Sequence, residues 1–159
     1  MTMRRLPVYR QTPGYCGPTA LRMVLAYFDI KKTETELARQ SRCTRARGVT
    51  AERLLGAARS LGLTGNIKDN ATLADLQRWV VIRRIPVIVD WFSGDESHFA
   101  VVANVAKGTL TLHDPDGGLV RRIPWTTFRR IWFIFRGTDV PSRTALRVRR
   151  MLVVYPAPR

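Results

Sequence analysis

Cys16 is the residue whose type and position most directly suggest chemistry in this 159-residue chain. It stands directly before an apolar stretch that predicts a helix, so its thiol is expected at the positive end of the helix dipole. Unpaired backbone N–H groups at that end favour the thiolate, which is the nucleophilic form of cysteine. The alternative is a small buried apolar residue, which is the commoner role of a cysteine.

The chain has two histidines, and both fall in stretches that predict strands. His98 begins HFAVVANV and His113 ends TLTLHD, with the short turn AKG between the two stretches. A hairpin of these strands brings their far ends together and places His98 beside Asp114. A cysteine with a histidine base and an acid that orients the base performs nucleophilic catalysis. His113 is a second candidate base, although a residue adjacent to Asp114 in a strand points to the opposite face.

Gln11 lies on a stretch that is expected to be a loop leading to Cys16. Its side-chain amide is a suitable donor for the oxyanion that forms when a thiolate attacks a carbonyl group. Structural alternatives exist for each of these residues. Gln11 can be an exposed loop residue, and either histidine can be a hydrogen-bonded residue at a sheet edge.

The elements that must position these residues change along the chain. Apolar residues three and four positions apart predict a buried helix face over 17–28. Thr33 and Glu36 have the spacing of a capping box, and Thr50 and Thr72 are expected to cap two further helices. The first half of the chain is therefore predicted to be mainly helical.

The second half has the patterns of strands. IPVIVDWF indicates a buried strand, HFAVVANV and TLTLHD a hairpin, and GGLVRRIP and WFIFRG two more strands around the helical turn PWTTFRR. Helices followed by an antiparallel sheet predict an α+β domain. We expect this domain to cover residues 1–140 and residues 141–159 to form a basic C-terminal strand or tail.

Composition limits the class of protein and its compartment. A hydrophobic content of 45% and a charged content of 25% are typical of a globular protein. The sequence lacks the apolar run of a signal peptide or of a bilayer span, so we expect a cytoplasmic protein without a transmembrane segment. The two cysteines lack the spacing of a zinc site, and the expected chemistry needs no metal and no organic cofactor.

The formal net charge of +15 would allow binding to nucleic acid or to an anionic membrane surface. The arginines are spread along the whole chain, however, and no helix-turn-helix, zinc-finger or ribonucleoprotein motif is present. No specific nucleic-acid partner is therefore expected. A basic nucleic-acid or membrane-surface binding protein with a structural cysteine is the main alternative to an enzyme, and a partner-binding module without turnover is another.

The stretches QTPGYCGPTAL, SHFAVV and LHDP resemble the bacteriocin-processing cysteine peptidases that cleave after double-glycine leaders. These are the peptidase domains of peptidase-containing ABC exporters, and freestanding relatives also occur. The resemblance covers roughly residues 5–136. It implies a papain-like cysteine peptidase fold, in which N-terminal helices pack on a C-terminal antiparallel sheet.

The same resemblance implies a role for each candidate residue. Cys16 would be the nucleophile, His98 the general base and acid, Asp114 the group that orients His98, and Gln11 an oxyanion donor. The implied substrate is a small peptide with a double-glycine-type leader, and a separate ABC exporter is an expected partner. Deamidation or transpeptidation would use the same residues. Cys43 is expected to be a buried or free thiol.

Overall fold

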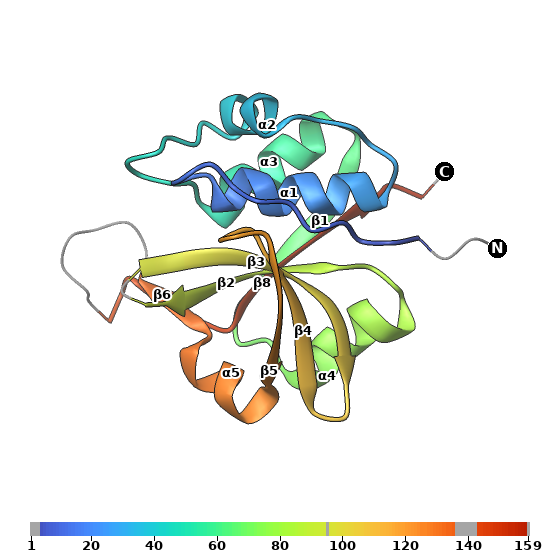
Figure 1. The fold of residues 1–159 in the computed structure, drawn as a ribbon, viewed down its shortest axis with the longest axis vertical. Coiled ribbons are helices and arrows are strands. Elements are labelled where there is room, and N and C mark those ends of the chain that lie inside the picture. The colour runs from blue at the N-terminus through green and yellow to red at the C-terminus, as the bar shows by residue number, and fades with distance from the viewer. Residues whose placement is uncertain (1–3, 95, 136–142, 159) are drawn as a thin grey trace.

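Helices cover both faces of an antiparallel sheet (Figure 1). The structure, a computed structural model, describes residues 4–94, 96–135 and 143–158. On one side lie α1 (Cys16–Tyr27), α2 (Glu34–Gln40) and α3 (Ala51–Ser60). On the other lie α4 (Leu73–Leu76), the π-helix η1 (Gln77–Ile82) and α5 (Trp125–Ile131). The prediction of an α+β fold with N-terminal helices packed on an antiparallel sheet is confirmed.

The main sheet has six strands in the order β1-β8-β2-β3-β4-β5. Their bounds are β1 Leu63–Lys68, β2 Val87–Ser93, β3 Glu96–Ala106, β4 Thr109–Asp114, β5 Leu119–Pro124 and β8 Arg150–Pro156. All neighbouring strands are antiparallel. A separate two-stranded sheet pairs β6 (Phe133–Phe135) with β7 (Leu146–Val148).

Both faces of the sheet are buried, which explains the continuous apolar run in β2. Ile88 belongs to the core that α1 and α3 share with the sheet. Val87 and Val89 belong to a second core, where they pack with Phe128 and Trp132. Successive side chains of a strand point to opposite faces, so a strand covered on both sides must be apolar at almost every position.

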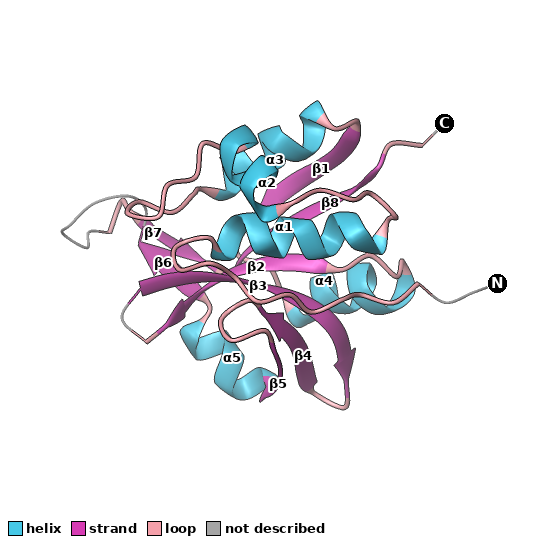
Figure 2. Ribbon diagram, turned by 45° about the horizontal axis from the view of Figure 1, so that its top comes forward, coloured by secondary structure: helices cyan, strands magenta, loops and turns pink. Residues whose placement is uncertain are grey.

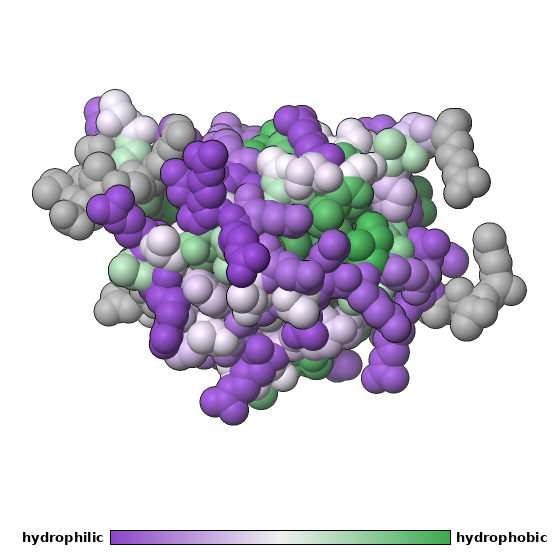
Figure 3. All heavy atoms as spheres, turned by 90° about the horizontal axis from the view of Figure 1, so that it is seen from above, coloured by the Kyte–Doolittle hydropathy of each residue, from purple (hydrophilic) through white to green (hydrophobic). Residues whose placement is uncertain are grey.

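The predicted helix starts are confirmed by their caps. The Thr33 side chain accepts a hydrogen bond from the Glu36 backbone N–H, and the Glu36 carboxylate accepts one from the Thr33 N–H. The Thr50 side chain caps α3 and the Thr72 side chain caps α4. Seen from above, the helical side is mostly hydrophilic around one apolar area (Figure 3).

The predicted hairpin of β3 and β4 is also present. Its turn contains Lys107 and Gly108, whose φ values are 52° and 70°. Two consecutive residues with positive φ are typical of the two-residue turn that joins twisted antiparallel strands. The far end of the hairpin pairs Val101 with His113.

Strand β1 was not predicted, because glycine and asparagine are uncommon in strands and LTGNIK contains both. A Cβ atom at Gly65 would lie 2.0 Å from the carbonyl oxygen of Val153, so only glycine allows β1 to approach β8 this closely. Residues 150–156, expected to form a strand or a tail, form β8 between β1 and β2. The expected domain boundary after residue 140 lies outside the described residues.

Helix α1 packs so closely against the loop before α3 that its second residue has no room for a side chain. A Cβ atom at Gly17 would lie 2.3 Å from Cγ1 of Val49, a residue with little rotamer freedom. We expect Gly17→Ala to lower the free energy of unfolding by about 1–3 kcal/mol, the usual cost of overpacking a core. Urea denaturation followed by circular dichroism measures this change.

Val49→Ala in the same chain provides the control, because it removes the atom with which the new methyl group would collide. The double variant should be about as stable as Val49→Ala alone. A double variant that still carries the full penalty of Gly17→Ala would show that the close contact is not the cause.

Candidate active site

Cys16 is the first residue of α1, and it is partly exposed. The residue before it, Tyr15, makes no side-chain capping hydrogen bond, and the first turn contains no acidic side chain. Among the described residues, the first backbone N–H groups of α1 therefore have no side-chain acceptor. This helix start can stabilise an anion, whether a thiolate or an oxyanion.

His98 and Asp114 meet at the far end of the hairpin, as the sequence predicts. Nε2 of His98 lies 2.5 Å from Oδ1 of Asp114, and the two residues are 9% and 1% exposed. Cys16 is the other group beside His98, and its interaction with the ring raises the pKa of His98. Because Nε2 faces the carboxylate, Nδ1 is the ring nitrogen left for the thiol. The structure thus brings together three of the four predicted residues.

The surroundings of His98 favour its charged form. Burial opposes the charge, but hydrogen bonds with Asp114 and Cys16, and the charges of both groups, raise the pKa of His98 to about 10. The ring is therefore an imidazolium at neutral pH. A neighbouring imidazolium is one of the arrangements that stabilise a thiolate in proteins.

Asp114 is held by donors from several segments. Oδ1 accepts a second hydrogen bond, from the Asp116 backbone N–H at 2.9 Å, and Oδ2 lies 2.6 Å from Nε of Arg121. Burial opposes the carboxylate, but the hydrogen bonds from His98 and Asp116 and the charges of His98 and Arg121 hold its pKa below the ordinary value of 3.8. A carboxylate fixed in this way can orient His98.

Arg121 is a site residue that the sequence analysis missed. It belongs to β5 and pairs with Leu112, two positions before Asp114. Residues two apart in a strand share a face, so Arg121 is the diagonal neighbour of Asp114 across the strands. The register of the β4–β5 hairpin around DPDGG would have indicated this pair.

His113 points to the other face of β4, as expected. Its Nδ1 lies 2.9 Å from the carbonyl oxygen of Pro7, in the segment that leads to Gln11. No described contact joins His113 to Cys16. This histidine therefore anchors the N-terminal segment, and His98 is the base candidate that the geometry favours.

The segment with Gln11 runs past the end of β4 to the start of α1 (Figure 2). Its backbone N–H donates to the Pro115 carbonyl at 2.9 Å, and a Cβ atom at Gly118 would come within 3.3 Å of the Arg10 backbone. In the described chain, the Gln11 side chain has one long contact, from Nε2 to the Thr12 carbonyl at 3.4 Å, and Oε1 has no partner. No described contact joins the Gln11 side chain to Cys16.

Two residues that the sequence analysis did not place at the site support the loop before Cys16. Glu34 accepts hydrogen bonds from the Thr12 backbone N–H at 2.8 Å and from the Thr19 hydroxyl at 2.6 Å. Cys43 is a free, buried thiol, as expected, with its sulfur 3.7 Å from the Gly14 carbonyl. Burial, together with the nearby Cys16 and Glu34, raises the pKa of Cys43 to about 11. Cys43 is therefore a neutral thiol at physiological pH.

Solved structures with a similar fold include two peptidase domains. The peptidase domain of Streptococcus ComA, a bi-functional ABC transporter involved in quorum sensing, has a TM-score of 0.75 at 21% identity and covers 96% of this chain and 100% of that one. A double glycine motif protease from an AMS/PCAT transporter, in complex with its leader peptide, has a TM-score of 0.73 at 23% identity and covers 97% and 94%. The papain-like peptidase fold implied by the resemblance is confirmed.

Sequence comparisons identify the family. An uncharacterised protein of Methanothermobacter marburgensis is 34% identical over 115 residues, which are 72% of this chain and 75% of that protein. Within the described part of the chain, no helix is both long and apolar enough to cross a bilayer. Residues 5–135 match the model of the Peptidase C39 family, and the chain therefore belongs to this family.

Proposed function

We propose that this member of the Peptidase C39 family is a cysteine peptidase that cleaves a small peptide after a double-glycine-type leader. The observation that carries the proposal is the position of His98, whose Nε2 lies 2.5 Å from Asp114 and whose pKa is raised by the neighbouring Cys16 at the start of α1. The substrate class is supported by the similar AMS/PCAT protease, which was solved with its leader peptide.

In the proposed acylation step, the Cys16 thiolate attacks the scissile carbonyl carbon. The oxyanion accepts hydrogen bonds from the Cys16 backbone N–H and from the Gln11 amide, once that side chain turns away from Thr12. His98 gives its Nδ1 proton to the leaving amine as the C–N bond breaks. Asp114 keeps the ring oriented and stabilises its charge.

In the deacylation step, neutral His98 removes a proton from water, and the resulting hydroxide attacks the thioester carbonyl. The carbon–sulfur bond then breaks, which releases the carboxylic acid and restores the thiolate–imidazolium pair. The overall reaction consumes one peptide bond and one water molecule.

ComA and the AMS/PCAT protease are parts of ABC transporters. We propose that this chain works in the cytoplasm and that its product passes to an ABC exporter. Deamidation and transpeptidation would use the same thiol chemistry, and the mass of the product distinguishes them from hydrolysis.

The first prediction concerns the reactivity of the two cysteines. Cys16 should be alkylated by limiting iodoacetamide well below pH 8, because His98 stabilises its thiolate. Cys43, with a pKa of about 11, should react later and serves as the internal control. Peptide mass spectrometry measures both rates across pH 4 to 9. In His98→Ala the early reaction of Cys16 should disappear. If both cysteines react alike and only above pH 8, Cys16 is an ordinary thiol.

The second prediction concerns cleavage. A synthetic peptide with a leader ending in Gly-Gly should be cut after the second glycine, and Cys16→Ala should abolish the cut. Gln11→Ala should lower kcat by about 10²- to 10³-fold with little change in KM, because the oxyanion forms only in the transition state. Arg10→Ala, a change at an exposed neighbour, is the matched control. A Gln11→Ala enzyme with full kcat would remove Gln11 from the mechanism.

The third prediction concerns the charge on His98. Asp114→Asn removes the negative charge that strengthens the hydrogen bond with His98, so the pKa of His98 should fall from about 10 by about 1–3 pH units. Ring-proton NMR titration measures this, with His113→Gln to assign the signals. Because folding raises the pKa of His98 above 6.5, its contribution to stability is complete below pH 6.5 and is lost as the pH rises through about 10. An unchanged His98 titration in Asp114→Asn would contradict the pairing.

A further inference from the structure

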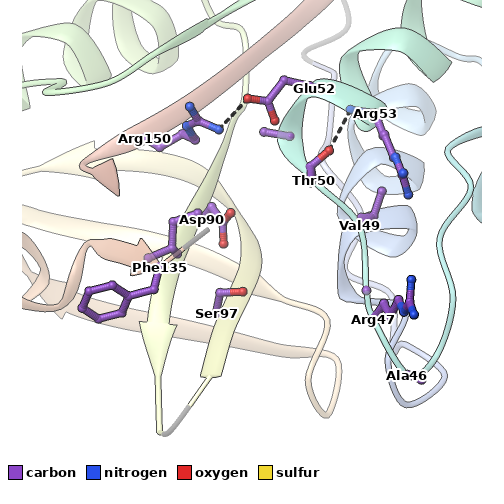
Figure 4. A pocket seen from close by; sticks show the side chains of 13 residues that line it. Ala46, Arg47, Val49, Thr50, Glu52, Arg53, Asp90, Ser97, Phe135 and Arg150 are labelled. Atoms are coloured by element: carbon purple, nitrogen blue, oxygen red, sulfur yellow. Dashed lines mark hydrogen bonds and ion pairs between the residues drawn. The ribbon is translucent and has the colours of Figure 1, made fainter. Parts of the chain in front are cut away.

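A pocket of about 730 Å³ lies between the helical layer and the sheet, next to the candidate active site (Figure 4). One of its lining residues, Ser97, directly precedes His98, and another, Val49, packs against Gly17 beside Cys16. Cys16 and His98 do not themselves line it. A substrate chain lying across the thiol can therefore place a nearby side chain in this pocket.

Asp90 forms part of the floor of the pocket. It lies two residues after Ile88 in β2 and so faces the same helical side of the sheet. Figure 4 shows the Asp90 carboxyl group directed into the pocket, toward the helical side. Asp90 is 5% exposed, and within the described part of the chain its Oδ1 has no hydrogen-bond partner. An acceptor that is buried without a donor destabilises the fold, and a ligand donor would remove this penalty.

Arg150 donates no described hydrogen bond to Asp90. Arg150 is opposite Asp90 in the sheet, but its guanidinium is engaged elsewhere. Nε and Nη2 contact the two Asp69 oxygens at 2.8 and 3.1 Å, and Nη1 contacts Glu52 at 2.9 Å. Burial outweighs the charges of Arg150 and His98 and raises the pKa of Asp90 to about 8. Asp90 is therefore mainly a neutral carboxyl group when no cation is bound, and a bound cation favours its carboxylate form.

Part of the wall of the pocket is apolar and can contact the methylene groups of a bound side chain. Apolar lining residues come from the loop before α3, from α3 and from β6, namely Ala46, Val49, Ala51, Ile134 and Phe135. Arg47 and Arg53 extend from the helical side, across the gap from Asp90 (Figure 4). The Arg53 guanidinium donates to the Arg42 carbonyl at 3.4 Å. A pocket with a partly apolar wall and a buried carboxyl group in its floor complements a side chain with methylene groups and a cationic tip.

We propose that this pocket is a specificity subsite that holds an arginine or lysine side chain of the peptide substrate, with the cationic tip donating to Oδ1 of Asp90. The inference rests on the proposed function, because the side chain belongs to the peptide that Cys16 attacks. The basic residue lies within a few positions of the scissile bond, since the pocket begins one residue from His98.

The test measures binding by the full chain with Cys16→Ala, which prevents turnover. Fluorescein-labelled peptides contain one Gly-Gly and an arginine at one of three positions on either side of it. Matched peptides carry citrulline there, which has nearly the same shape and no charge. Anisotropy should show at least about tenfold tighter binding of the arginine peptide at one position. Equal affinities at every position, including no binding of either peptide, would overturn the subsite.

A second comparison assigns the preference to Asp90. Asp90→Asn in the same background should bind the arginine and citrulline peptides equally, and thermal unfolding checks its fold. If that variant does not fold, Ser97→Lys decides instead, because a lysine at this exposed lining position can pair with Asp90 and should also remove the preference. A preference that persists in the folded variant would overturn the assignment.

Cleavage by the wild-type chain separates this inference from the proposed function. Cys16-dependent cleavage of arginine and citrulline peptides at equal kcat/KM would overturn the subsite and keep the peptidase. Selective binding of the arginine peptide, removed by Asp90→Asn but followed by no cleavage, would support the subsite and overturn the proposed function.

Discussion

The carboxylate of Asp114 is the constraint on which the site depends. It is 1% exposed, and an anion removed from water is tolerated only when donors surround it. Its donors come from three places: His98 in β3, the Asp116 backbone in the turn after β4, and Arg121 in β5. Three neighbouring segments must therefore be in register before the Asp114 carboxylate has all its donors. The same register places the His98 imidazole beside Cys16.

The end of β4 organises the N-terminal segment as well as the charge. The two residues use opposite faces of the strand, since Asp114 contacts His98 on one face and His113 contacts the Pro7 carbonyl on the other. The following Pro115 carbonyl holds the Gln11 backbone. A single strand end thus positions both the charged pair and the loop that precedes the thiol. Glu34 fixes the same loop to α1 from the other side.

The features that could be predicted from the sequence are local. Helix caps, the apolar face of α1 and the β3–β4 hairpin follow from residues a few positions apart, and the hairpin alone places His98 beside Asp114. The features that were missed depend on distant segments. The contact of Arg121 with Asp114 follows only from the register of β5 against β4. The requirement for glycine at position 65 follows only from the close approach of β8. Asp90 lies in an apolar run that predicts a buried strand, and nothing local shows that its carboxyl group borders a pocket.

The position of β8 has a consequence for synthesis. Residues 150–156 form β8, which lies between β1 and β2. Its Pro156 is opposite Leu63 of β1, and its Arg150 is opposite Asp90 of β2. During synthesis, β1 therefore stays apart from the β2–β5 strands until β8 is available. The helix with Cys16 is made earlier. Pairing of such distant segments is slow, because the entropy cost of closing a long loop precedes the stabilising contacts between the strands. A chain that stops before β8 would thus leave the facing edges of β1 and β2 unpaired, although its thiol is already in place.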